Sequence, residues 1–146
     1  MYYYKDYQII EHTADIALKA YGKHKKDLFV NAARGLFFII FNRHPKMQKG
    51  IHYENWSISC SGSNLEDVMF SWLSELLYIH LTKALVLENF LIDSLNGQRL
   101  RAEVQGVCFK QLQLTVIREI KGVTYYGLSI KKDTSGIWNT QIIFDI

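Results

Sequence analysis

The residues best suited to chemistry are acidic residues near the two ends of the chain. The motif Glu11-His12-Thr13-Ala14-Asp15 follows the first apolar run, and Asp145-Ile146 closes the last one. Asp145 and the main-chain oxygens of Ile146 offer several hard oxygen ligands, and Asp15 would add a carboxylate if the two strands were neighbours. Two carboxylates about 4 Å apart repel by roughly 4 kcal/mol at an effective dielectric constant of about 20. We therefore expect a divalent cation or a lysine between them, or strands that lie apart.

Three further side chains could support such a site. Lys121 begins an apolar segment, where it could pair with the carboxylates or reach a phosphate, or could be an edge-strand lysine that discourages pairing with other chains. His12 could hold a carboxylate through a ring N–H, or make a single structural hydrogen bond in a turn. Glu75 falls at the margin of a buried helical stripe, so a surface position and a supporting role both stay open.

Hydrophobic periodicity predicts the elements that must position these residues. Apolar residues recur at helical spacing from Lys25 to Phe41, and again after the capping-box pair Ser63 and Glu66 as far as His80. Strand patterns are predicted at 7–10, 16–21, 56–60, 86–93, 100–109, 114–120, 123–131 and 138–146.

These elements predict one α+β domain over residues 1–146. We expect two layers, with two main helices packed on a mostly antiparallel or mixed sheet. Within the strands, Asp15 alternates with Ile16 and Leu18, and Asp145 alternates with Phe144. Because successive strand residues point to opposite faces, both aspartates should face away from the helices.

Composition narrows the class of protein. The chain has 146 residues, is 49% hydrophobic and carries a formal charge of +3, which permits contact with RNA or an acidic partner without requiring it. No apolar run approaches the roughly 18 residues of a membrane span, and the first residues lack a leader-like pattern, so we expect a cytoplasmic protein. Cys60 and Cys108 are isolated, which argues against a disulfide framework or a zinc site.

Six motifs in order resemble the archease family. Any one alone would be a weak signal, but together they cover both ends and both predicted helices. They are EHTAD (11–15), AYGK (20–23), NAARGLF (31–37), WLSELLY (72–78), IKGVTYY (120–126) and IIFDI (142–146).

The resemblance implies a function and a metal site. Archeases act with the GTP-dependent RNA-splicing ligase of the RtcB type, so it implies a non-catalytic protein cofactor that helps this ligase become guanylylated and turn over. It also implies Asp15, Asp145 and the main-chain oxygens of Ile146 as metal ligands, and a functional role for Lys121. Oxygen ligands without imidazole or thiolate suit calcium, magnesium or manganese. The simpler alternatives are a turn-capping Asp15 and a solvated Asp145.

The sequence also departs from the family. We expect acidic residues just after each helix, yet residues 42–44 and 79–83 contain none, which predicts a weaker metal site. The basic loop at 43–49 could instead contact RNA. Because no glycine-rich phosphate loop or GxSxG motif is present, the chain shows no active site of its own. The remaining alternatives are a chaperone-like interaction module and a metal-assisted phosphohydrolase.

Overall fold

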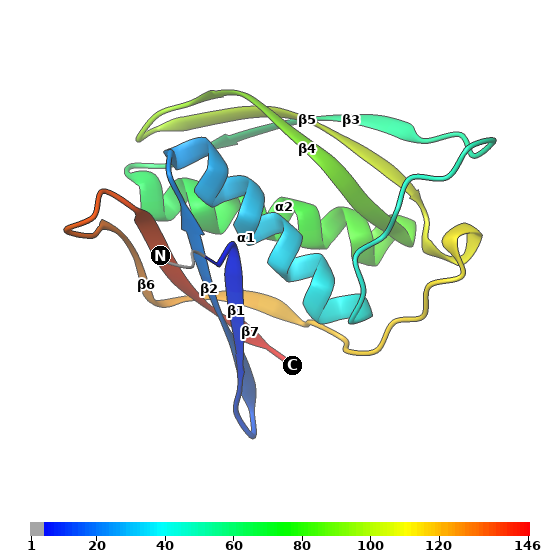
Figure 1. The fold of residues 1–146 in the computed structure, drawn as a ribbon, viewed down its shortest axis with the longest axis horizontal. Helices are drawn as coiled ribbons and strands as arrows, with labels where there is room; N and C mark the ends of the chain where they lie inside the picture. The colour runs from blue at the N-terminus through cyan, green and yellow to red at the C-terminus, as the bar shows by residue number, and fades with distance from the viewer. Residues whose placement is uncertain (1–4) are drawn as a thin grey trace.

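The structure is a computed structural model that describes residues 5–146; residues 1–4, which belong to the predicted domain and showed no leader-like pattern, lie outside this range. The described elements, drawn in Figure 1, are β1 (Tyr7–Glu11), β2 (Asp15–Gly22), α1 (Lys25–Phe41), β3 (Glu54–Ser61), α2 (Leu65–Lys83), β4 (Leu85–Leu95), β5 (Arg99–Cys108), the 3-10 helix η1 (Phe109–Leu112), β6 (Gly122–Lys132) and β7 (Trp138–Asp145).

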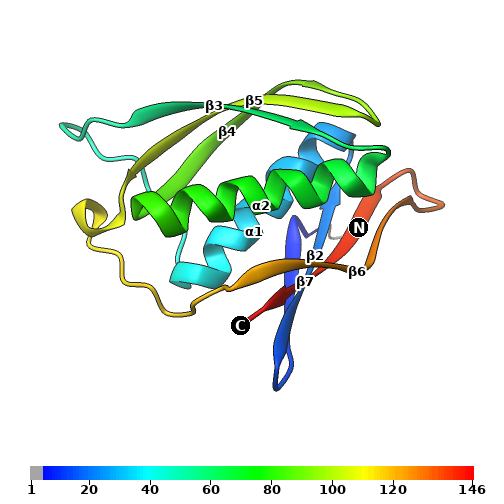
Figure 2. The same cartoon turned by 180° about the vertical axis from the view of Figure 1, so that it is seen from behind.

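The strands form two antiparallel sheets with the helices between them. The strand order is β1-β2-β7-β6 in one sheet and β3-β5-β4 in the other. Helix α1 contacts β2 and β4, and α2 contacts β6 and β3, so each helix touches both sheets (Figures 1 and 2). The predicted α+β class, with two helices packed on antiparallel strands, is confirmed. The division into two sheets, one on each side of the helices, is a feature that the prediction did not contain.

The core lies on the inner faces of both sheets. Trp72 of α2 is fully buried, and its indole N–H donates to the carbonyl of Phe29 in α1 at 2.9 Å. On the four-stranded sheet, Leu18 of β2 and Ile142 of β7 are paired and fully buried. Because side chains alternate along a strand, the residues on either side of Leu18 and Ile142 in the sequence point to the outer face of this sheet. No helix within residues 5–146 is long and apolar enough to cross a lipid bilayer.

Both helices start immediately after a tight strand-to-helix connection. A Cβ added at Gly22 would lie 2.3 Å from the backbone nitrogen of Leu28, so the chain at this position accepts only glycine without rearrangement. Each helix then has an aspartate in its first turn that accepts a backbone N–H from before the helix: Asp27 from His24 at 3.1 Å, and Asp67 from Ser63 at 2.9 Å.

The N-terminal cap of α2 differs from the predicted capping box of Ser63 and Glu66. Asn64 is the N-cap, because its backbone is extended and its side-chain oxygen accepts the N–H of Asp67 at 2.9 Å. Glu66 instead accepts the backbone N–H of Ile130 in β6 at 3.2 Å. The prediction was wrong by one residue, since asparagine caps a helix as well as serine does.

The predicted strand at 114–120 was also wrong. Gln113 adopts a left-handed conformation after η1, and the following segment passes the C-terminal end of α1. The backbone N–H groups of Ile117 and Arg118 both donate to the carbonyl of Ile40, at 2.8 and 3.1 Å. These donors satisfy a helix carbonyl and are unavailable for a strand ladder.

Candidate functional site

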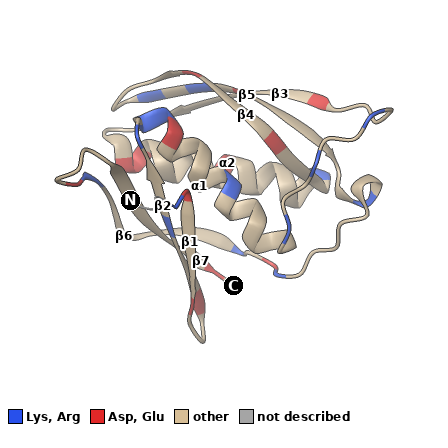
Figure 3. Cartoon of the chain, viewed as in Figure 1, with Lys and Arg blue, Asp and Glu red and all other residues tan. Residues whose placement is uncertain are grey.

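Asp15 and Asp145 lie directly opposite each other on the neighbouring strands β2 and β7. The next pair, Ile16 and Phe144, is at most 1% exposed and faces the helices. Because side chains alternate along a strand, the two aspartates project from the outer face, as their alternation predicts. Figure 3 shows acidic residues at the tip of the β1–β2 hairpin and at the end of β7. The sequence left open whether these strands are neighbours, and the structure places them side by side.

The hairpin between β1 and β2 fixes the position of Asp15. The backbone N–H of His12 donates to the carbonyl of Asp15 at 3.0 Å, which closes the turn between the two strands. The His12 ring is exposed and makes no hydrogen bond within the described part of the chain. The structure therefore places His12 next to the candidate site, with its backbone rather than its ring in contact with Asp15.

Lys121 lies on the other side of Asp145. Its backbone N–H donates to the carbonyl of Asp145 at 2.8 Å, and the next residue, Gly122, pairs with Asp145 in the β6–β7 ladder. The Lys121 side chain is exposed and has no ion-pair partner among residues 5–146. The structure therefore places the backbone of Lys121 beside Asp145 and leaves both predicted roles of its side chain as predictions.

An ion pair that the sequence analysis did not predict lies at the same end of the sheet, on the face that packs against the helices. Arg118 donates to the Glu11 carboxylate at 2.7 Å. Glu11 pairs with Ile16 and so projects to the opposite face from Asp15. Although Glu11 belongs to the same motif as Asp15, its charge is compensated by Arg118. Arg118 reaches Glu11 because segment 113–121 passes the end of α1. No pattern in the sequence predicts that path.

Glu75 lies away from the aspartate pair. It is exposed on α2, and its charge reaches Cys60 of β3, in the three-stranded sheet. Burial, with a smaller effect from the Glu75 carboxylate, raises the pKa of the Cys60 thiol to about 11. The structure therefore brings Asp15, Asp145, Lys121 and the backbone of His12 together but leaves Glu75 out of this group.

The donor set at the aspartate pair fits a hard divalent cation. Within residues 5–146, no group of three or more His, Cys, Asp and Glu side chains could hold a metal ion. Two carboxylates from Asp15 and Asp145 would be supplemented by main-chain oxygens, including those of Ile146, and by water. Calcium, magnesium and manganese all accept such mixed oxygen ligands. The weaker metal affinity expected from the sequence stays a prediction.

Basic and polar side chains occupy the opposite end of the same outer face. The residues that line a cavity there include Lys19 and Tyr21 of β2, Lys131 of β6, and Asn139 and Gln141 of β7. Lys19 is paired with Gln141 and Lys131 with Asn139, so these side chains share a face. The sheet thus presents negative charge at one end and positive charge at the other. The alternation of Asp15, Ala17, Lys19 and Tyr21 in the sequence could have shown this.

Comparison with known proteins gives one consistent result. A model of the Archease protein family matches residues 7–146. "Protein archease" of Methanosarcina barkeri is 35% identical over 146 residues, with 97% of each chain covered. "Protein archease" of Pyrococcus furiosus is 32% identical over 145 residues, covering 97% of this chain and 99% of that protein. The resemblance found in the motifs is confirmed.

Two solved structures share the fold. A solution structure of a Methanobacterium thermoautotrophicum protein superimposes with a TM-score of 0.66 at 23% identity, covering 97% of this chain and 99% of that one. A crystal structure from Thermotoga maritima, described as an archease and possible chaperone, gives a TM-score of 0.62 at 20% identity over 100% of both chains. At these identities the likeness shows the fold alone.

Proposed function

Because this chain belongs to the archease family, we propose that it is an accessory protein of a GTP-dependent RNA-splicing ligase of the RtcB type. In this proposal it promotes guanylylation and repeated turnover of the ligase in tRNA splicing or RNA repair, within the cytoplasm. The observation that carries the proposal is the pairing of Asp15 with Asp145 at one end of the four-stranded sheet, where the backbone of Lys121 also donates to Asp145. These are the residues for which the family resemblance implied a role.

In the proposed action, the chain supplies charged groups at one end of the four-stranded sheet, on its outer face. Asp15 and Asp145 would hold a calcium, magnesium or manganese ion, whose positive charge binds phosphate or carboxylate oxygens. Lys121 would add a second, mobile positive charge beside it. Since both aspartates are at strand ends on an outer face, the site can meet a partner without opening the core. We also propose that the basic loop at 43–49 contacts RNA directly. The role of the aspartate pair does not depend on this contact.

A second candidate function is a chaperone-like interaction module. The Thermotoga maritima relative of this fold carries that description. This chain exposes large apolar side chains, among them Tyr126 at 86% and Ile117 at 65% exposed. Exposed apolar side chains can mark a surface for another protein. A chaperone would act on many unfolded proteins, whereas a ligase cofactor acts on one enzyme.

A ligation assay with limiting ligase distinguishes the candidates. Substoichiometric amounts of the wild-type chain should convert single-turnover ligation to multiple turnover and speed the labelling of the ligase by GTP. Asp15→Asn, Asp145→Asn and Lys121→Ala should each reduce this stimulation by about tenfold or more, because each removes one charge from the site. Glu75→Gln is the matched control, since it removes one exposed negative charge elsewhere.

The other outcomes are equally informative. A chain that leaves the ligase rate unchanged but suppresses aggregation of unrelated unfolded proteins would support the chaperone candidate. Phosphate ester hydrolysis in the absence of any ligase would support a metal-assisted phosphohydrolase. Loss of stimulation in Glu75→Gln equal to that in Asp145→Asn would contradict the assignment of the site to the aspartate pair.

A further inference from the structure

A cavity of about 340 Å³ lies between α1, β4 and the segment that follows α1. Its apolar wall includes Phe37 of α1 and Leu87 and Phe90 of β4; the rings of Phe37 and Phe90 stack with their centres 6.1 Å apart. Strand β4 is an edge strand of the three-stranded sheet and pairs with β5 alone among the described strands. Its volume is within the range of small-molecule sites, about 300–1,000 Å³.

Glu88 of β4 lines this cavity and lacks a compensating charge. Its side chain is 9% exposed, and its Oε1 atom is buried without a hydrogen-bond partner in the described region. Neither of the ion pairs found in residues 5–146 includes it. Burial raises the pKa of the Glu88 carboxyl, and a hydrogen bond with Tyr53 lowers it in part. A buried carboxylate with an unsatisfied oxygen is costly unless a cation or donor reaches it.

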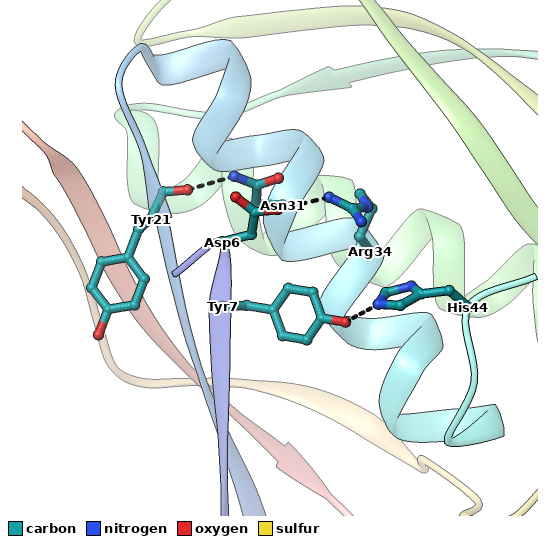
Figure 4. A network of polar contacts seen from close by, with 6 residues as sticks. All are labelled: Asp6, Tyr7, Tyr21, Asn31, Arg34 and His44. Atoms are coloured by element: carbon teal, nitrogen blue, oxygen red, sulfur yellow. Dashed lines mark hydrogen bonds and ion pairs between the residues drawn. The ribbon is translucent and has the colours of Figure 1, made fainter. Parts of the chain in front are cut away.

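The basic residues at the cavity are already engaged by other groups (Figure 4). Arg34 forms an ion pair with Asp6 of 3.0 Å, and the His44 ring shares a hydrogen bond with the Tyr7 hydroxyl. Burial and the nearby Arg34 charge lower the pKa of His44, which favours its neutral form at pH 7. The cavity therefore has apolar walls, a compensated arginine, a neutral histidine and one uncompensated carboxyl group.

We propose that this cavity binds a linear aliphatic amine, whose ammonium group pairs with Glu88 while its methylene chain lies along Phe37 and Phe90. The buried Oε1 reaches the ligand by rotation about the last side-chain bond of Glu88, a torsion with a broad, shallow preference. An inorganic anion would be repelled by Glu88. A metal ion would gain nothing from the apolar walls and would find a single carboxyl group. The same chemistry could come from a free diamine or from the lysine side chain of a protein.

Titration calorimetry on the full chain tests the proposal with 1,5-diaminopentane as the probe. Wild type should bind it, and Glu88→Gln should weaken binding at least tenfold. The matched control is Glu103→Gln, which removes the charge of an exposed residue on β5 of the same sheet and should bind like wild type. A comparison on the ligand side needs no variant: 1-pentanol, which has the same carbon chain without the charge, should not bind to wild type.

The two sources of the amine are separated by a second probe. Nα-acetyl-lysine methylamide that binds as tightly as the diamine would point to a lysine of a protein partner, whereas binding of the diamine alone would point to a free amine. Absence of binding by both probes at millimolar concentration would overturn the proposal, as would equal affinity in wild type and Glu88→Gln. None of these outcomes depends on the ligase or on the aspartate pair.

Discussion

Replacing Asp145 with asparagine tests whether the opposed carboxylates repel each other in the metal-free protein. Asp145 and Asp15 are directly paired, a geometry in which Cβ atoms are about 4.5–5.5 Å apart. Two charges about 5 Å apart repel by roughly 0.8 kcal/mol in bulk water and about 3 kcal/mol at an effective dielectric constant of about 20. Since Asp145 is exposed and Asp15 only half-buried, the lower end applies. We expect Asp145→Asn to raise the free energy of unfolding by about 0.5–1 kcal/mol.

Thermal unfolding followed by circular dichroism measures this effect in chelator and in excess metal. In chelator, the variant should melt about 1–4 °C above wild type, because about 1 kcal/mol shifts Tm by roughly 2–4 °C at this chain length. At a calcium or manganese concentration about 100-fold above Kd, wild type should gain about 2.7 kcal/mol, and the order should reverse.

Two results would refute this reasoning separately. A variant that is no more stable than wild type in chelator would mean that the paired carboxylates do not repel each other significantly. An equal gain of stability from metal in both proteins would mean that Asp145 is not a ligand. Glu75→Gln serves again as the control, and its response to metal should match that of wild type.

The remaining predictions concern the fold. Gly22→Ala should destabilise the protein by about 1–3 kcal/mol in urea unfolding, because the new methyl group would meet the backbone of Leu28; unchanged stability would contradict this close approach. Asn64→Ala should lower the free energy of unfolding by about 1 kcal/mol by removing the N-cap of α2, whereas Ser63→Ala should change it little. The reverse order would support the capping box of Ser63 and Glu66 that the sequence predicted. Burial lowers the pKa of His80, so the unfolded state takes up its proton first and stability should fall as pH drops below about 6.5. His80→Gln should flatten that slope, and an unchanged slope would assign it elsewhere.

The parts of the fold predicted from sequence are those with strong local patterns. Helix α1 begins and ends where the periodicity placed it, at Lys25 and Phe41. The outward orientation of Asp15 and Asp145 also followed from the alternation in their strands. These properties depend on residues a few positions apart, so a single sequence is enough to show them.

The parts that failed depend on distant segments. The apolar residues Leu114 and Ile120 suggested a strand, and both are indeed buried. The backbone between them nevertheless donates to the end of α1, a partner that no local pattern shows. The burial of Glu88 has the same origin. It occupies a strand position beside Asn89, whose left-handed backbone marks a bulge, and it faces residues of α1 across the cavity while its side chain bonds to Tyr53.

The position of β7 explains why the candidate metal site needs the complete sheet. This strand comes last in the chain but lies between β2 and β6. Its pairing on one side brings Asp145 opposite Asp15, and on the other side brings it to the backbone of Lys121. These three residues are far apart in the sequence, and the pairing of β7 brings them together. A change that weakens the β7 pairing should therefore lose metal binding and folding together, whereas Asp145→Asn should separate them.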